Sequence, residues 1–182
     1  MKMKVVRKVT AVLICCFALS CWGLQAQNTF AKGDKVVNLG IGVGRSYSAG
    51  YKSSILPISG SFEYGVKDHL FDDKSSLGVG AYLGYAQDKL SLIDNSWKVS
   101  HTIVGVRGGL HYQLVDKLDT YAGLMLGYNV VSVSSSGSGI SGSGFDWSIY
   151  VGGRYYFTES IGAFAEIGYG IAAVQLGVAL KF

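Results

Sequence analysis

Residues 37–44 read VNLGIGVG, the first of the alternating segments in the chain. Val and the larger aliphatic residues alternate with Asn and Gly, a period of two that places successive side chains on opposite faces of a β-strand. One face is therefore apolar, and the other carries only small or polar side chains. The stretch predicts a β-strand with one face in an apolar environment and the other in a space that admits only small or polar side chains.

The same alternation recurs along the rest of the chain and predicts seven more strands. Their ranges are 56–66, 77–86, 102–114, 121–131, 145–157, 161–170 and 173–182. A β-strand that crosses a membrane needs about 9 to 11 tilted residues, and most of these segments have that length. The spacing therefore favours a membrane barrel over a soluble sheet.

Aromatic residues on the apolar face mark the ends of the predicted strands. Tyr85, Tyr128 and Tyr169 end the odd strands, whereas Phe62, Tyr64, Tyr112, Tyr155, Phe157 and Phe182 end the even strands. Because successive strands run in opposite directions, the two sets form rings at opposite rims. Aromatic girdles at both interfaces are typical of a barrel embedded in a bilayer.

The face opposite the aromatics distinguishes a membrane barrel from a soluble one. In a soluble barrel this face would meet water and would carry many Lys and Glu residues. Here it is mostly Gly, Ala, Ser and Asn, which suit the cramped interior of a narrow barrel. We therefore predict an all-β fold, an eight-stranded antiparallel up-and-down transmembrane β-barrel.

The first 26 residues are typical of a cleaved Sec-type signal peptide. Four basic residues within the first eight positions precede an apolar run that reaches Leu24. Cleavage is expected after Ala26, which leaves residues 27–182 as one barrel domain. Lipoprotein processing at Cys21 is the alternative.

Removing this segment changes the charge and the redox chemistry of the chain. The whole chain has 16 basic and 12 acidic residues, and four of the basic ones lie in the predicted signal, so the remainder is balanced. The basic charge therefore gives no reason to expect nucleic acid as a partner. Cys15, Cys16 and Cys21 also leave, so no thiol remains for catalysis or a disulfide.

The connections between the strands predict the orientation. Residues 45–55, 87–101 and 132–144 are long and polar and are expected to form extracellular loops. Residues 115–119 and 158–160 are tight turns expected on the periplasmic side. Residues 67–76 are long for a periplasmic turn, and the connection near Ile171 is short for an outer loop.

Charged residues of both signs fall on the small-residue face: Glu63, Arg107, His111, Arg154 and Glu166. A turn at 158–160 places Arg154 and Glu166 diagonally near each other, which predicts an ion pair; a second pair, Glu63 with Arg107, would reach across the lumen. We favour a buried ionic plug over a proton or ion path, because an eight-stranded barrel leaves space for side chains and little continuous water.

Motifs for catalysis or metal binding are weak. Ser100 and His101 suggest a hydrolytic pair, but adjacent strand residues point to opposite faces. His69 lies in an Asp-rich turn, where the ligand spacing matches no cation-binding motif. Glycines alternate within strands and form no phosphate-binding loop. We therefore expect no catalysis, no metal and no cofactor.

The C-terminal residues carry a family resemblance. Leu176, Val178, Leu180 and Phe182 alternate outward, and Gly177, Leu180 and Phe182 match the terminal signal that the outer-membrane assembly machinery recognises. The chain resembles the small eight-stranded outer-membrane barrels of the OmpA and OmpX type over its whole mature length. The resemblance implies an integral protein of the Gram-negative outer membrane, in contact with its lipid and lipopolysaccharide and with the assembly machinery during biogenesis.

The resemblance also implies the function. We expect a role in envelope integrity, together with binding of an extracellular ligand or adhesion through the surface loops. A lipid A deacylase or acyltransferase at the outer rim is the alternative from another class. A narrow pore is a third hypothesis, disfavoured by the size of the barrel.

Overall fold

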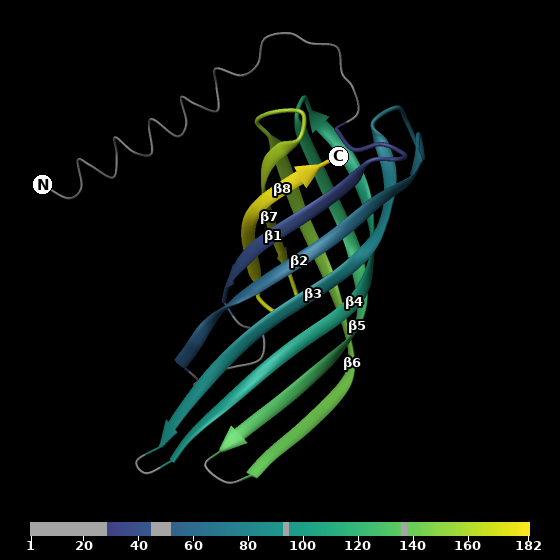
Figure 1. The fold of residues 1–182 in the computed structure, drawn as a ribbon. Coiled ribbons are helices and arrows are strands. Elements are labelled where there is room, and N and C mark those ends of the chain that lie inside the picture. The colour runs from purple at the N-terminus through teal and green to yellow at the C-terminus, as the bar shows by residue number, and fades with distance from the viewer. Residues whose placement is uncertain (1–28, 45–51, 93–94, 136–137) are drawn as a thin grey trace, which may run out of the picture.

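The computed structural model describes residues 29–44, 52–92, 95–135 and 138–182, which form eight antiparallel strands (Figure 1). The strands are β1 (Lys35–Val43), β2 (Lys52–Asp68), β3 (Ser75–Leu92), β4 (Asn95–Val115), β5 (Leu118–Ser135), β6 (Ser138–Tyr156), β7 (Ile161–Gly168) and β8 (Val174–Lys181). The predicted signal peptide and Cys21 lie outside the described residues. Within those residues, no helix is long and apolar enough to cross a membrane.

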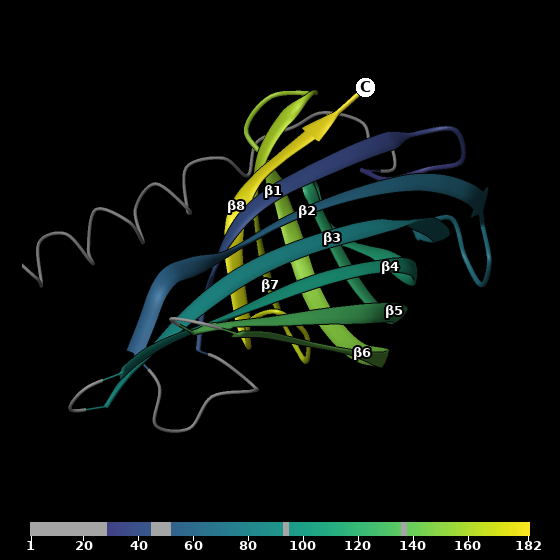
Figure 2. The same cartoon turned by 60° about the horizontal axis from the view of Figure 1, so that its bottom comes forward.

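Each strand pairs with its neighbours in the sequence, and β8 returns to pair with β1. Figure 2 shows these two strands side by side, where the barrel closes. The seam is antiparallel, with Gly40 opposite Gly177 near its middle. The predicted eight-stranded up-and-down barrel is therefore confirmed.

The connections at one end of the barrel are short turns, whereas long hairpins project from the other end. At one end, which we call the short-turn end, lie the turns at 69–74, 116–117 and 157–160 together with the C terminus. At the other, the long-hairpin end, the β3–β4 and β5–β6 hairpins extend far past β7 and β8 (Figure 1).

The prediction of long loops at 87–101 and 132–144 is wrong for most of these residues. β3 and β4 stay paired out to Leu92 and Asn95, and β5 and β6 stay paired out to Ser135 and Ser138. Two hairpin strands satisfy each other's backbone hydrogen bonds wherever they run, whatever their side chains. In the connection at 45–55, residues 52–55 belong to β2, and 45–51 lie outside the described residues.

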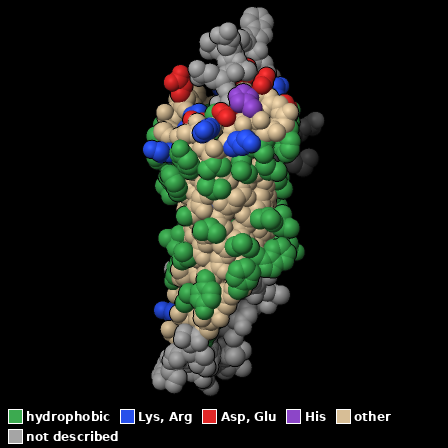
Figure 3. Space-filling view, turned by 90° about the vertical axis from the view of Figure 1, so that its right-hand side faces the viewer, with side chains coloured by type: hydrophobic (Ala, Val, Ile, Leu, Met, Phe, Trp, Pro, Cys, Tyr) green, Lys and Arg blue, Asp and Glu red, His purple; other side chains and the backbone are tan. Residues whose placement is uncertain are grey.

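The outer wall is apolar and the interior is polar. On β5, Leu124 and Leu126 are more than half exposed, whereas Tyr121 and Met125 on the other face are buried. This is the reverse of a soluble barrel, and it suits a wall surrounded by lipid. On the face drawn in Figure 3, charged side chains gather at the short-turn end and hydrophobic ones cover the wall beneath them.

Aromatic side chains lie near both rims of this wall. Seven of the nine predicted girdle residues are exposed, and Tyr85 and Tyr155 are partly exposed: the seven are Phe62, Tyr64, Tyr112, Tyr128, Phe157, Tyr169 and Phe182. Two further aromatic residues that were not predicted as girdle residues are also exposed: Phe145, which pairs with Tyr128, and Trp147. Beyond Tyr128 towards the hairpin tip, Ser132 and Ser134 occupy the outward positions of β5. The strands therefore continue past the apolar wall.

Glycines and tyrosines face each other inside the barrel. Gly123 lies opposite Tyr150, and Gly152 lies opposite Tyr121. A Cβ atom on Gly123 would come within 2.4 Å of the Tyr150 hydroxyl, and one on Gly152 within 2.6 Å of the Tyr121 ring. The small residues of the inner face thus provide the space that the large tyrosines fill.

Candidate functional site

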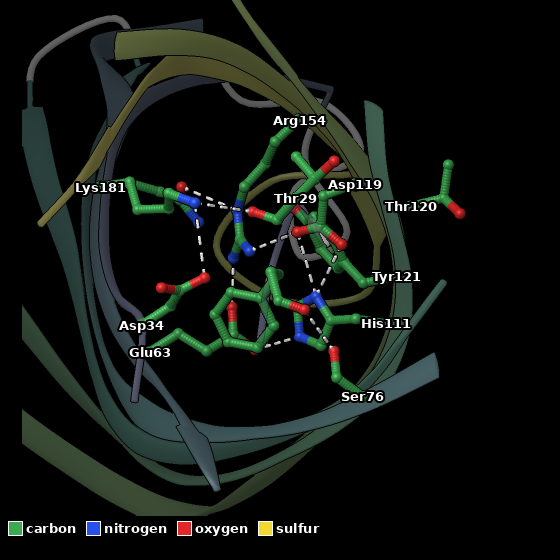
Figure 4. A network of polar contacts seen from close by, with 12 residues as sticks. Thr29, Asp34, Glu63, Ser76, His111, Asp119, Thr120, Tyr121, Arg154 and Lys181 are labelled. Atoms are coloured by element: carbon green, nitrogen blue, oxygen red, sulfur yellow. Dashed lines mark hydrogen bonds and ion pairs between the residues drawn. The ribbon is translucent and has the colours of Figure 1, made fainter. Parts of the chain in front are cut away.

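The interior holds a closed ring of buried charges at the short-turn end, which we call the charge ring (Figure 4). It consists of Glu63, His111, Asp119 and Arg154, from β2, β4, β5 and β6. Arg154 donates from Nη1 to Asp119 Oδ2 at 2.8 Å and from Nη2 to Glu63 Oε2. Each carboxylate also contacts His111, so the contacts form a complete cycle.

The position of His111 in this cycle couples its protonation state to the ionisation of two carboxyl groups. Its Nδ1 lies 3.0 Å from Asp119 Oδ1, and its Nε2 lies 3.0 Å from Glu63 Oε1. When Glu63 and Asp119 are both ionised, their oxygens can only accept, so both ring nitrogens must donate. A neutral imidazole can donate from one nitrogen only. His111 is therefore an imidazolium in this arrangement.

A second ion pair lies next to the charge ring, further towards the long-hairpin end. Arg107 donates to Glu166 Oε2 at 2.7 Å, and the Tyr121 hydroxyl donates to the same oxygen at 3.2 Å. The Arg107 guanidinium lies 3.8 Å from the centre of the Tyr150 ring, within range of a cation–π interaction. Tyr121 also has Arg154 4.5 Å from its ring centre. Its ring therefore connects the two sets of charges.

The charges of the charge ring and of the Arg107–Glu166 pair balance. Glu63, Asp119 and Glu166 carry three negative charges, and Arg107, Arg154 and the His111 imidazolium carry three positive ones. Burying an unpaired charge is expensive, whereas paired and hydrogen-bonded charges are tolerated. The arrangement is chemically a neutral plug made of fixed ion pairs, and its side chains fill the section of the barrel where they lie.

All five predicted interior charges lie inside the barrel, but the predicted pairing is wrong. Arg154 contacts Glu63 and Asp119, whereas Glu166 contacts Arg107. The reason is the register. Asp119 lies directly opposite Arg154 on β5, whereas Glu166 is diagonal to it on β7 and two residues nearer the long-hairpin end.

Sequence reasoning missed Asp119 because it assigned residues 115–119 to a turn. In the structure β5 begins at Leu118, and the turn occupies residues 116–117. The alternation of inward and outward residues on β5 could have identified Asp119 as an interior residue. Tyr121 faces inward, so Asp119 two residues earlier had to face inward as well.

The two weaker candidate sites do not assemble. Ser100 lies on the outward face, where its hydroxyl donates to the Ser132 carbonyl at 3.3 Å, and the adjacent His101 belongs to the opposite face. Thus the strand separates these two side chains. The hydrolytic pair weighed from the sequence is not brought together.

The turn at 69–74 uses its acidic residues for its own structure. Asp72 accepts from the Lys74 amide and the Tyr112 hydroxyl, both at 3.0 Å, and Asp73 contacts His69. Desolvation raises the pKa of Asp72, but these hydrogen bonds and those of Ser75 outweigh it, so the pKa lies below the usual carboxyl value. Among the described residues, no group of His, Cys, Asp and Glu side chains could hold a metal ion.

Known structures share this architecture. Ail, the attachment invasion locus protein of Yersinia pestis, has a TM-score of 0.56 at 18% identity, over 83% of this chain and 99% of Ail. Ail has also been solved with the heparin analogue sucrose octasulfate. The N-terminal β-barrel domain of Pseudomonas aeruginosa OprF has a TM-score of 0.52 at 18% identity, over 83% and 98%. These similarities show the fold.

The family comparison covers nearly the whole chain. The family described as the outer membrane protein beta-barrel domain matches residues 12–182. A comparison with curated proteins finds no match. The matched range includes all eight strands and every residue of the charge ring. The chain is thus an integral outer-membrane barrel, and it belongs to the outer membrane protein beta-barrel family.

Proposed function

We propose that this barrel is a non-catalytic surface protein that binds a partner through its long-hairpin end and contributes to envelope integrity. The observation that carries this proposal is the extension of β3 to β6 past the aromatic rim, where the outward side chains become polar. The charge ring supports it too, since a section filled by fixed ion pairs leaves no lumen for a transported substrate. Binding at the projecting hairpins remains the role that this architecture serves best.

The proposal includes an orientation and a route to the membrane. Outer-membrane barrels have short periplasmic turns and longer extracellular loops, so the long-hairpin end would face outward. Residues 1–26 would act as the Sec-type signal peptide. Gly177, Leu180 and Phe182 would then be read by the assembly machinery, and the apolar wall would contact lipid and lipopolysaccharide.

The hairpins offer one specific means of binding. β6 pairs with β7 only from Tyr150 onward, so in the described part of the chain its residues 138–148 pair with β5 alone. An unpaired strand edge is a template on which an extended segment of another polypeptide can add. The partner we infer is therefore a protein that presents such a segment.

Individual backbone groups on this edge can be identified. The Ile149 carbonyl accepts from Tyr169 on the β7 side. Because backbone groups alternate along a strand, those of Trp147, Phe145 and Ser143 face the same, unpaired side. A proline is tolerated where its missing N–H would face solvent on an edge strand. Ser143→Pro therefore removes one edge donor while the pairing of β5 with β6 is kept.

Adhesion tests the proposal. Cells that display the protein are applied to surfaces coated with extracellular-matrix proteins or with heparin. Wild type and Ser143→Ala should be retained several-fold better on the protein surface than Ser143→Pro. Ser143→Ala is the matched control, since it removes the hydroxyl that contacts Tyr128 but keeps the backbone donor. If cells that display the wild-type protein and cells that lack the protein were retained equally on every surface, surface binding would be refuted.

The catalytic alternative has its own test. The barrel is reconstituted into outer-membrane lipid, and the lipid A is then analysed by mass spectrometry. We expect no acyl chain to be lost or gained, because Ser100 and His101 lie on opposite faces of β4. A change in acylation above that of protein-free lipid would overturn the non-catalytic proposal.

A further inference from the structure

The chain before β1 enters the barrel at the short-turn end. Phe30 is only 3% exposed, and its ring stacks on the His111 imidazole with centroids 4.1 Å apart and planes 28° apart. The Arg154 guanidinium lies 5.7 Å from the centre of the same ring. The Phe30 ring thus contacts the two cations of the charge ring, and in a buried site such cation–π contacts are favourable.

Side chains of the barrel also hold the backbone of this segment. Gln113 Oε1 accepts from the Thr29 amide at 2.8 Å, and the Ser76 hydroxyl donates to the Phe30 carbonyl at 2.9 Å. Lys181 Nζ donates to the Thr29 carbonyl at 3.2 Å. These three side chains come from β4, β3 and β8. The segment is therefore held from several sides of the mouth, as Figure 4 shows in part.

The rest of the segment forms a turn against β2. The Ala31 amide donates to Asp34 Oδ2 at 2.9 Å, and Gly33 and Asp34 exchange backbone hydrogen bonds with Gly65. A Cβ atom on Gly65 would lie 2.0 Å from the Ala31 carbonyl oxygen. Only glycine at this position allows the segment to lie so close to the wall.

We propose that the mouth at the short-turn end is a peptide-binding site, and that its ligand is the chain's own segment 29–34, which closes the interior at this end. In this site the aromatic ring of Phe30 lies against the buried cations of the charge ring. Barrel side chains also form hydrogen bonds with the peptide groups on either side of Phe30. This proposal does not depend on surface binding, because the site lies at the opposite end of the barrel.

Thiol accessibility tests the closure. Ala179 is fully buried and belongs to the same apolar cluster as Phe30, and the described residues contain no cysteine. In full-length Ala179→Cys protein with Cys15, Cys16 and Cys21 changed to Ser, a charged methanethiosulfonate reagent should label the thiol at position 179 slowly. Adding Phe30→Ala should accelerate labelling at least tenfold. Adding Phe71→Ala, which removes a 79% exposed aromatic ring at the same end, should leave the rate unchanged.

Rescue in trans tests the site as a binding site. In the same background, deletion of Thr29, Phe30 and Ala31 should expose the thiol, and the peptide acetyl-Thr-Phe-Ala-Lys-Gly-Asp-amide should protect it again. The same peptide with Phe30→Ala should not protect it. Equal protection by the two peptides, or a thiol that stays protected in the deleted chain, would overturn the proposal.

Folding is checked on the same samples. An unboiled closed barrel migrates faster than the boiled chain on a denaturing gel, and only samples that show this shift are compared. Phe30→Leu supplies a second variant that keeps an apolar side chain of similar size but loses the ring. The thiol of this variant should be labelled at a rate between that of the protein that keeps Phe30 and that of the Phe30→Ala variant. A rate equal to that of Phe30 would show that the ring has no part in recognition.

Discussion

Arg154 and Asp119 lie directly opposite each other on β6 and β5, and their side chains meet at 2.8 Å inside the barrel. Asp119 is the second residue of β5 and lies next to the turn at 116–117. Through Glu63 the same guanidinium also reaches β2 across the lumen. The Arg154 side chain therefore connects β6 directly to β2, although backbone hydrogen bonds link these two strands only through the strands that lie between them in the wall.

Replacing Arg154 should destabilise the barrel strongly. Arg154→Ala leaves Glu63 and Asp119 without their arginine, and breaking a buried pair in this way costs about 3 to 5 kcal/mol. The free energy of unfolding in detergent, measured by urea titration, reports the loss. An unchanged unfolding midpoint would show that these ion pairs contribute little.

A pair of double-mutant cycles distinguishes the observed pairing from the diagonal one. Arg154 and Glu63 are in contact and should show a coupling energy between about 0.5 and 3 kcal/mol. Arg154 and Glu166 should couple much more weakly, since Glu166 is bonded to Arg107. Stronger coupling of Arg154 to Glu166 than to Glu63 would restore the pairing predicted from the sequence.

His111 should carry protons on both ring nitrogens at neutral pH. Each ring nitrogen lies 3.0 Å from a carboxylate oxygen, and an ionised carboxylate can only accept a hydrogen bond. Nitrogen NMR of the ring in the folded barrel measures this directly, with His111→Gln used to assign the signals. A single protonated nitrogen would mean that one of the two carboxylates is protonated instead.

The pattern of residues predicted the wall better than the interior contacts. Alternation identifies which face each residue occupies, and it placed Glu63, Arg107, His111, Arg154 and Glu166 inside. It does not determine which side chains meet, because contacts across a lumen depend on register and on the direction in which long side chains extend. Phe30 lay outside any alternating segment, so no strand pattern could assign it to the interior.

Gly177→Ala should impair closure even without the assembly machinery. A Cβ atom at this position would lie 2.0 Å from the Leu39 carbonyl oxygen across the β1–β8 seam. Overpacking of this kind costs about 1 to 3 kcal/mol. Refolding into detergent, followed by the gel-mobility shift, measures the effect. Gly144→Ala is the control, because nothing lies within 4 Å of its Cβ position.

This experiment also separates two roles of the C-terminal residues. Gly177 belongs to the predicted assembly signal, so a role in recognition alone would leave refolding in detergent normal. We expect reduced refolding for Gly177→Ala and normal refolding for Gly144→Ala. Normal refolding of both would assign Gly177 to recognition.

Arginine substitutions along β5 should locate the boundary of the bilayer. Leu124 is 57% exposed near the middle of the apolar wall, between Leu118, which lies opposite the girdle residue Tyr155, and Tyr128 at the other rim. Ser132 occupies an outward position of the same strand beyond Tyr128. An arginine facing lipid near the midplane costs about 2 to 4 kcal/mol, whereas one near the interface costs about 0 to 1 kcal/mol. Unfolding in lipid vesicles should therefore show a large loss for Leu124→Arg and almost none for Ser132→Arg. Equal losses would mean that the bilayer covers the hairpins as well, and the projecting surface proposed for binding would not exist.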